Sequence, residues 1–140
     1  MFKISNNDFK VLIKNKEFLE KIDNLLENVP RKDMYYKDKL RDICNELIKY
    51  IFECSYEYDK NNIHYYYKKI KASIAEIDFM LDRLYSKKYI SSTSLYRIGN
   101  FLIEINKLVT GWINAIGKNE SVNKWFKRSI WKWNKKECKK

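Results

Sequence analysis

Residues 63–84 read IHYYYKKIKASIAEIDFMLDRL, and residues 95–116 read LYRIGNFLIEINKLVTGWINAI. In both stretches apolar residues recur at alternating steps of three and four positions, with polar and charged residues between them. This spacing places the apolar side chains on one narrow helical stripe, so each stretch predicts a long amphipathic helix. Trp112 is therefore expected in the core, and Gly111 beside it predicts close approach of another helix. The two stripes are Ile63, Tyr67, Ile70, Ile74, Ile77, Leu81 and Leu84, and Leu95, Ile98, Leu102, Ile105, Val109, Trp112 and Ile116.

Two more helices are expected upstream. The first starts after the polar cluster of residues 5–8, whose side chains can cap free backbone N–H groups. It ends before Pro30, because proline disfavours helical geometry in the residue that precedes it. The second runs from near Asp33 to about Tyr58. Their apolar stripes are Phe9, Leu12, Ile13, Leu19, Ile22, Leu25, Leu26 and Val29, and Leu40, Ile43, Cys44, Leu47, Ile51, Cys54 and Tyr58.

The connections between these four helices are short, which favours antiparallel neighbours. Residues 59–62 and Ser91 or Ser92 supply caps for the third and fourth helices, and Gly117 is typical of the position that closes a helix. The chain has only three Gly and one Pro, too few for the turns of an all-β fold. The sequence therefore predicts an all-α, antiparallel up-down-up-down four-helix bundle over residues 1–117. A basic, Trp-rich extension follows over residues 118–140.

The net charge of +11 is unevenly distributed along the chain. Residues 118–140 contain nine Lys or Arg and two Glu, so about a sixth of the chain carries a net charge of +7. An excess this concentrated predicts a polyanionic partner, with nucleic acid favoured over membrane. Solubility alone is the alternative explanation.

The extension interleaves aromatic and basic residues and can form a short fifth helix. Indole rings stack on unpaired bases, and Lys and Arg neutralise phosphates, so this pattern suits RNA or single-stranded DNA. Two alternatives stay open: the aromatic residues can pack on the bundle or a neighbouring subunit, and a basic Trp-containing helix can lie on an anionic membrane. The residues predicted to contact nucleic acid here are Lys124, Trp125, Lys127, Arg128, Trp131, Lys132 and Trp133.

Little material is available for a catalytic centre. His64 is the only histidine, and no Arg lies four to six positions before it, as it does in helical ribonucleases of the HEPN class. It is expected at the surface. The Glu-x-x-His motif of di-iron bundles, the P-loop and a Ser/His/Asp set are all missing from the sequence. We therefore expect a binding protein that is not an enzyme and that needs no metal or cofactor.

Cysteine use and hydropathy indicate a cytoplasmic protein. Cys44 and Cys54 lie ten residues apart in one predicted helix, about 15 Å along its axis, whereas a disulfide requires Cα atoms within about 7 Å. They are expected to be buried thiols in a reducing compartment. The N-terminus has no apolar signal region, and no apolar run approaches the roughly 20 residues that span a bilayer, so no membrane partner is expected.

Four local motifs, in their order and spacing, resemble the accessory variability determinant (Avd) proteins of diversity-generating retroelements. The motifs are VPRKDMY at 29–35, IDFML at 77–81, YISS at 89–92 and LxxIxxLVxGWI at 102–113. Avd proteins belong to a wider bacterial four-helix-bundle family that includes proteins encoded in 23S rRNA intervening sequences. The Ser-Ile-Pro-x-Asn-Ile-Ala-Glu-Gly stretch typical of the intervening-sequence branch is missing here, which favours the Avd branch.

The resemblance implies a non-catalytic accessory subunit. Avd-like proteins form homopentameric barrels with a basic surface, and they bind the element's reverse transcriptase and nucleic acid during error-prone cDNA synthesis. The alternative is a structural bundle of the intervening-sequence type without a nucleic-acid partner. The Trp-rich extension goes beyond the family's core, so the resemblance implies nothing for it. Basic residues near the matching motifs, which the resemblance implies contact nucleic acid, are Arg31, Lys32, Arg83, Lys87, Lys88 and Arg97.

Overall fold

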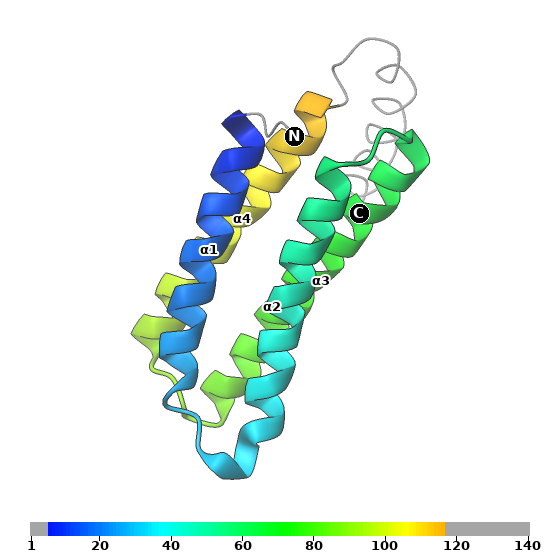
Figure 1. Cartoon of the computed structure of the whole chain (residues 1–140). Coiled ribbons are helices and arrows are strands. Elements are labelled where there is room, and N and C mark those ends of the chain that lie inside the picture. Colours follow the sequence, from blue (N-terminus) through cyan, green and yellow to red (C-terminus); the bar gives the residue numbers. More distant parts are fainter. Residues whose placement is uncertain (1–5, 117–140) are drawn as a thin grey trace, which may run out of the picture.

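The structure is a computed structural model that describes residues 6–116 as four helices packed side by side (Figure 1). The helices are α1 (Asn6–Leu26), α2 (Met34–Ser55), α3 (Lys60–Ser86) and α4 (Ser92–Ile116), and a short 3₁₀ turn at Arg31–Asp33 precedes α2. α2 packs most extensively on α3, and α1 on α4. The predicted all-α, up-down-up-down four-helix bundle is confirmed.

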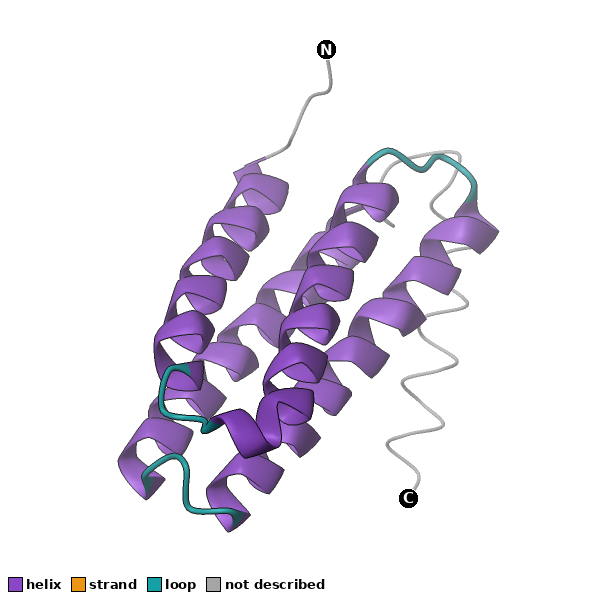
Figure 2. Ribbon diagram, turned by 60° about the horizontal axis from the view of Figure 1, so that its bottom comes forward, coloured by secondary structure: helices purple, strands orange, loops and turns teal. Residues whose placement is uncertain are grey.

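Alternating helix directions put the chain reversals at opposite ends of the bundle. The α1–α2 and α3–α4 connections lie together at one end, and the α2–α3 connection lies at the other, beside the start of α1 and the end of α4 (Figures 1 and 2). The caps predicted for α3 and α4 form: Asp59 Oδ1 accepts a 2.8 Å hydrogen bond from the Asn61 amide, and Ser91 Oγ accepts one of 3.1 Å from the Ser94 amide. Gly117 and the extension lie outside the described residues.

The stripes predicted for α3 and α4 form most of their half of the core. Trp112 is 1% exposed, as expected. In α3 two positions outside the predicted stripe, Ser73 and Met80, are also buried, whereas Ile74 is only half-buried. The expectation for Gly111 was wrong, because a Cβ there would meet no atom within 4 Å and the residue is exposed.

The stripe predicted for α1 was partly wrong. Ile13 is 42% exposed, whereas Asn15 is buried among apolar residues. The amide of Asn15 donates a 2.9 Å hydrogen bond to the Val11 carbonyl one turn earlier, which satisfies it inside the core. The observed stripe keeps the three-and-four spacing only when this polar residue is counted. Its members are Val11, Asn15, Phe18, Ile22, Leu26 and, beyond the helix, Val29.

The expectation for the end of the second helix also needs correction. α2 ends at Ser55 instead of near Tyr58, so the Tyr58 ring is 88% exposed in the connection. Cys44 and Cys54 are buried free thiols, as predicted. Burial raises the pKa of Cys44 to about 12, so this thiol stays protonated at neutral pH.

Candidate nucleic-acid interface

The bundle collects the six predicted basic residues of the helical core at one end. Arg31 and Lys32 lie in the 3₁₀ turn, Arg83 in the last turn of α3, Lys87 and Lys88 just after it, and Arg97 near the start of α4. All are exposed except Lys87, which is half-buried. We call these six residues the basic end. The other predicted residues lie outside the described part of the chain, namely Lys124, Trp125, Lys127, Arg128, Trp131, Lys132 and Trp133.

Tyr36 organises two of these cations. The Arg83 guanidinium lies 5.9 Å from the centre of the Tyr36 ring, and Lys87 Nζ lies 5.1 Å from it. Arg83 Nη2 also donates a 3.3 Å hydrogen bond to the Tyr36 hydroxyl, and this contact lowers the pKa of the tyrosine. Tyr35 meets the Tyr36 ring edge-on at 5.6 Å and is 70% exposed. The basic end therefore combines positioned cations with an exposed aromatic ring.

Asp33 ties the two connections of the basic end together. The Tyr89 hydroxyl, after α3, donates a hydrogen bond to Asp33 Oδ2, and Lys87 Nζ lies 3.7 Å from the same oxygen. The hydrogen bond from Tyr89, followed by the charges of Lys87 and Lys32, lowers the pKa of Asp33. This carboxylate is thus engaged within the protein, which leaves the neighbouring exposed cations available to an anionic ligand.

The Asp33–Tyr89 contact predicts a pH-dependent contribution to stability. Because the folded-state pKa of Asp33 lies below its ordinary value of 3.8, its stabilising effect is complete above that value and is lost as the pH falls through the folded-state pKa. Tyr89→Phe should therefore destabilise the protein more at pH 7 than at pH 2.5, as measured by urea unfolding followed by circular dichroism. An equal loss at both pH values would mean that the hydrogen bond does not depend on the charged carboxylate.

Lys88 adopts an unusual backbone conformation at the end of α3. Its φ is +67°, and it is the only non-glycine residue with positive φ in the described chain. The Lys88 amide donates a 2.9 Å hydrogen bond to the Tyr85 carbonyl, and the Tyr89 amide donates one of 3.1 Å to the Leu84 carbonyl. These two bonds form a Schellman motif, in which the residue at the position of Lys88 is usually glycine. A long cation thus occupies a position where glycine would fold with less strain.

Lys88→Gly should raise the free energy of unfolding by about 0.5–1 kcal/mol, because relief of left-handed strain exceeds the added flexibility of the unfolded chain. Urea unfolding measures this gain. Lys88→Ala is the matched control: it removes the same charge but keeps a Cβ, so it should give no gain. If both variants are equally stable, charge rather than backbone conformation determines the effect.

Asp33, Tyr36 and Tyr89 were not among the predicted site residues. Asp33 and Tyr36 follow closely after the Arg31-Lys32 pair, and Tyr89 follows Lys87 and Lys88, so adjacency in sequence is a usable signal. What the sequence does not show is that Asp33 and Tyr89, which lie 56 positions apart in two different connections, share a hydrogen bond.

His64 is half-buried, so the expectation of a surface position holds only in part. Burial, with a smaller effect from the charge of Lys68, lowers its pKa. Within residues 6–116, no three His, Cys, Asp or Glu side chains gather where they could hold a metal ion. None of the helices described has the length and apolarity needed to cross a membrane.

Protein-family models, curated proteins and solved structures give no match to this chain. The arrangement of the basic end is therefore the main observation that bears on function. Its cations can neutralise phosphates and its exposed Tyr35 ring can stack on a base.

Proposed function

We propose that this protein is a non-catalytic nucleic-acid-binding subunit whose basic end contacts the phosphate backbone. The observation that carries the proposal is the set of five exposed cations, gathered from three segments at one end of the bundle, namely Arg31, Lys32, Arg83, Lys88 and Arg97. The exposed Tyr35 ring supports a single-stranded ligand, because a stacking platform needs an unpaired base.

More specifically, we propose an accessory subunit of a diversity-generating retroelement that binds the reverse transcriptase together with template RNA or cDNA. Two of the motifs that resemble Avd proteins, residues 29–35 and 89–92, lie in and around the two connections at the basic end. Large apolar side chains off the core stripes support self-association, for which we propose a pentamer. Exposed examples are Tyr35, Phe52, Tyr56, Tyr65, Phe79 and Tyr96.

The test is binding of a fluorescein-labelled single-stranded RNA to the full chain, followed by anisotropy over a range of salt concentrations. We expect binding that weakens steeply with salt, because each phosphate contact releases counterions. RNA should be bound without cleavage when common divalent metals are added. Failure to bind at low salt would favour the structural bundle of the intervening-sequence type.

Two further measurements address the partners. Light scattering of the purified protein should give about five times the 17.1 kDa mass of one chain, and a monomer would rule out the pentamer. Co-purification with a reverse transcriptase encoded beside this gene should depend on the folded bundle. A genome without such a neighbouring gene would contradict the retroelement role while leaving nucleic-acid binding intact.

A further inference from the structure

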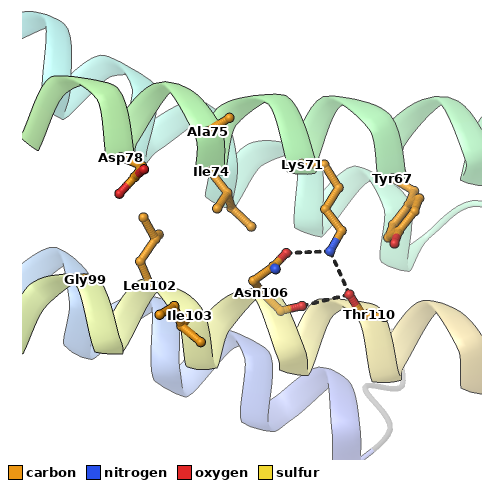
Figure 3. Close-up of a pocket in the computed structure, with 10 residues that line it drawn as sticks. All are labelled: Tyr67, Lys71, Ile74, Ala75, Asp78, Gly99, Leu102, Ile103, Asn106 and Thr110. Atoms are coloured by element: carbon orange, nitrogen blue, oxygen red, sulfur yellow. Dashed lines mark hydrogen bonds between the residues drawn. The ribbon is translucent and has the colours of Figure 1, made fainter. Parts of the chain in front are cut away.

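An open groove of about 660 Å³ lies between α3 and α4 on the outside of the bundle. Ile74 of α3 and Leu102 of α4 point into the space between the two helices (Figure 3), and Ala75 and Ile103 also line the groove. Ile103 is 53% exposed although α4 packs on both α1 and α3. The groove is therefore an apolar surface that the four helices leave uncovered.

Polar groups mark the two ends of this groove. At one end Lys71 Nζ donates hydrogen bonds of 2.5 Å to Asn106 Oδ1 and 2.7 Å to Thr110 Oγ1. At the other end lie Gly99 and the exposed carboxylate of Asp78 (Figure 3). The Lys71 end is nearer to Ile116, where α4 ends, and the Asp78 end is nearer to the basic end.

We propose that residues 121–134 of the same chain occupy this groove as a fifth helix that runs antiparallel to α4. The segment carries apolar residues at helical spacing, so one face of such a helix would be apolar and the rest basic. That face matches the apolar groove, and its members are Val122, Trp125, Phe126, Ile130 and Trp133.

Chain length supports this occupant. Residues 117–121 span up to roughly 17 Å when extended, which is enough to reverse direction after Ile116. From Val122 to Trp133 is eleven residues, as is the distance along α4 from Gly99 to Thr110 at the two ends of the groove. Both correspond to about 16 Å of helix. The apolar face and the groove are thus equal in length.

Charge also supports the antiparallel direction. In this orientation Lys132, near the end of the segment, and Lys135 and Lys136, which directly follow it, reach the Asp78 end of the groove. The carboxylate then meets cations, and the cations that face outward continue towards the basic end. This inference goes beyond the proposed function, because it assigns the aromatic rings of the extension to packing and only its cations to an anionic ligand.

Cross-linking in the full chain tests the inference. In a Cys138→Ser background, where Cys44 and Cys54 are buried, Ile103→Cys is combined with Ile130→Cys. Because docking holds the two thiols close, we expect a disulfide within one chain under mild oxidation, at least about ten-fold faster than in the control. The control combines Ile130→Cys with Phe52→Cys, a comparably exposed apolar position on α2. Non-reducing gels and peptide mass spectrometry follow the reaction.

The cross-linking result either supports docking of the extension in the groove or overturns it. Equal rates in the two variants, or no disulfide in either, would overturn the proposal. A disulfide between two chains would assign the groove to the extension of a second copy instead. Adding single-stranded RNA should leave the rate unchanged; a loss of cross-linking on RNA addition would show that the rings stack on bases. Since both Ile103 and Phe52 are exposed, neither substitution removes core packing, and circular dichroism verifies the fold.

Discussion

Replacing Trp112 with alanine is expected to lower the free energy of unfolding by about 3–5 kcal/mol, the usual cost of removing a fully buried aromatic ring. Trp112 is the largest of the fully buried side chains in the described core. A loss of this size is a large share of the stability of a domain of this length, so partial unfolding at 37 °C is expected. Urea unfolding monitored by circular dichroism measures it.

Two variants sharpen this prediction. Trp112→Phe should cost only about 1–2 kcal/mol, because the indole N–H is buried with no acceptor in the described structure and its removal offsets part of the lost packing. Tyr96→Ala, in the same helix but 72% exposed, should change stability by less than about 0.5 kcal/mol. A loss below about 1 kcal/mol for Trp112→Ala would mean that the ring does not hold the core together.

Neutralising the basic end should have the largest effect on ligand binding. With Arg31, Lys32, Lys88 and Arg97 all changed to Gln, the slope of log affinity against log salt should become shallower by about 2.8, or 0.7 for each single-strand phosphate that is no longer neutralised. Raising the salt from 50 to 200 mM should then narrow the affinity gap between the original protein and the variant by about 50-fold. Arg83 and Lys87 are left unchanged because they contact Tyr36.

A variant of equal charge separates a local site from the field of the whole protein. The control changes four other exposed lysines to Gln, all of them outside the basic end: Lys10, Lys16, Lys68 and Lys107. These changes lower the net charge by the same four units. This control should retain most of the salt slope. If the slope falls equally in both variants, binding reflects overall positive charge, and the assignment of the basic end would be wrong.

Helix number, order and most of the core followed from apolar spacing because packing on one side of a helix leaves a strict period in the sequence. The period failed where a core position is polar: Asn15 and Ser73 are buried, yet the apolar pattern passes over them to Ile13 and Ile74. The end of α2 was misplaced, at Tyr58, for a different reason. Residues 55–58 contain no proline or other residue that marks the end of a helix.

The candidate site was predictable in part. Local motifs pointed to its six cations, and the antiparallel topology then brought them to one end. The contacts that position them could not be predicted, because the Asp33–Tyr89 hydrogen bond and the contact between the Arg83 guanidinium and Tyr36 join segments about fifty residues apart. The α3–α4 groove could not be predicted from the sequence either, because it depends on how the two helices pack against each other and not only on which residues each helix contains.

The placement of the three connections also determines how the bundle responds to mechanical load. α1 begins and α4 ends at the same end of the bundle, and the two helices lie side by side (Figure 1). A force that separates those two ends loads the interface between the helices turn by turn, as in a zip, instead of shearing all of it at once. The rupture would travel from the α2–α3 connection towards the basic end. There the Asp33–Tyr89 hydrogen bond holds the other two connections together, so the basic end is the last part to open.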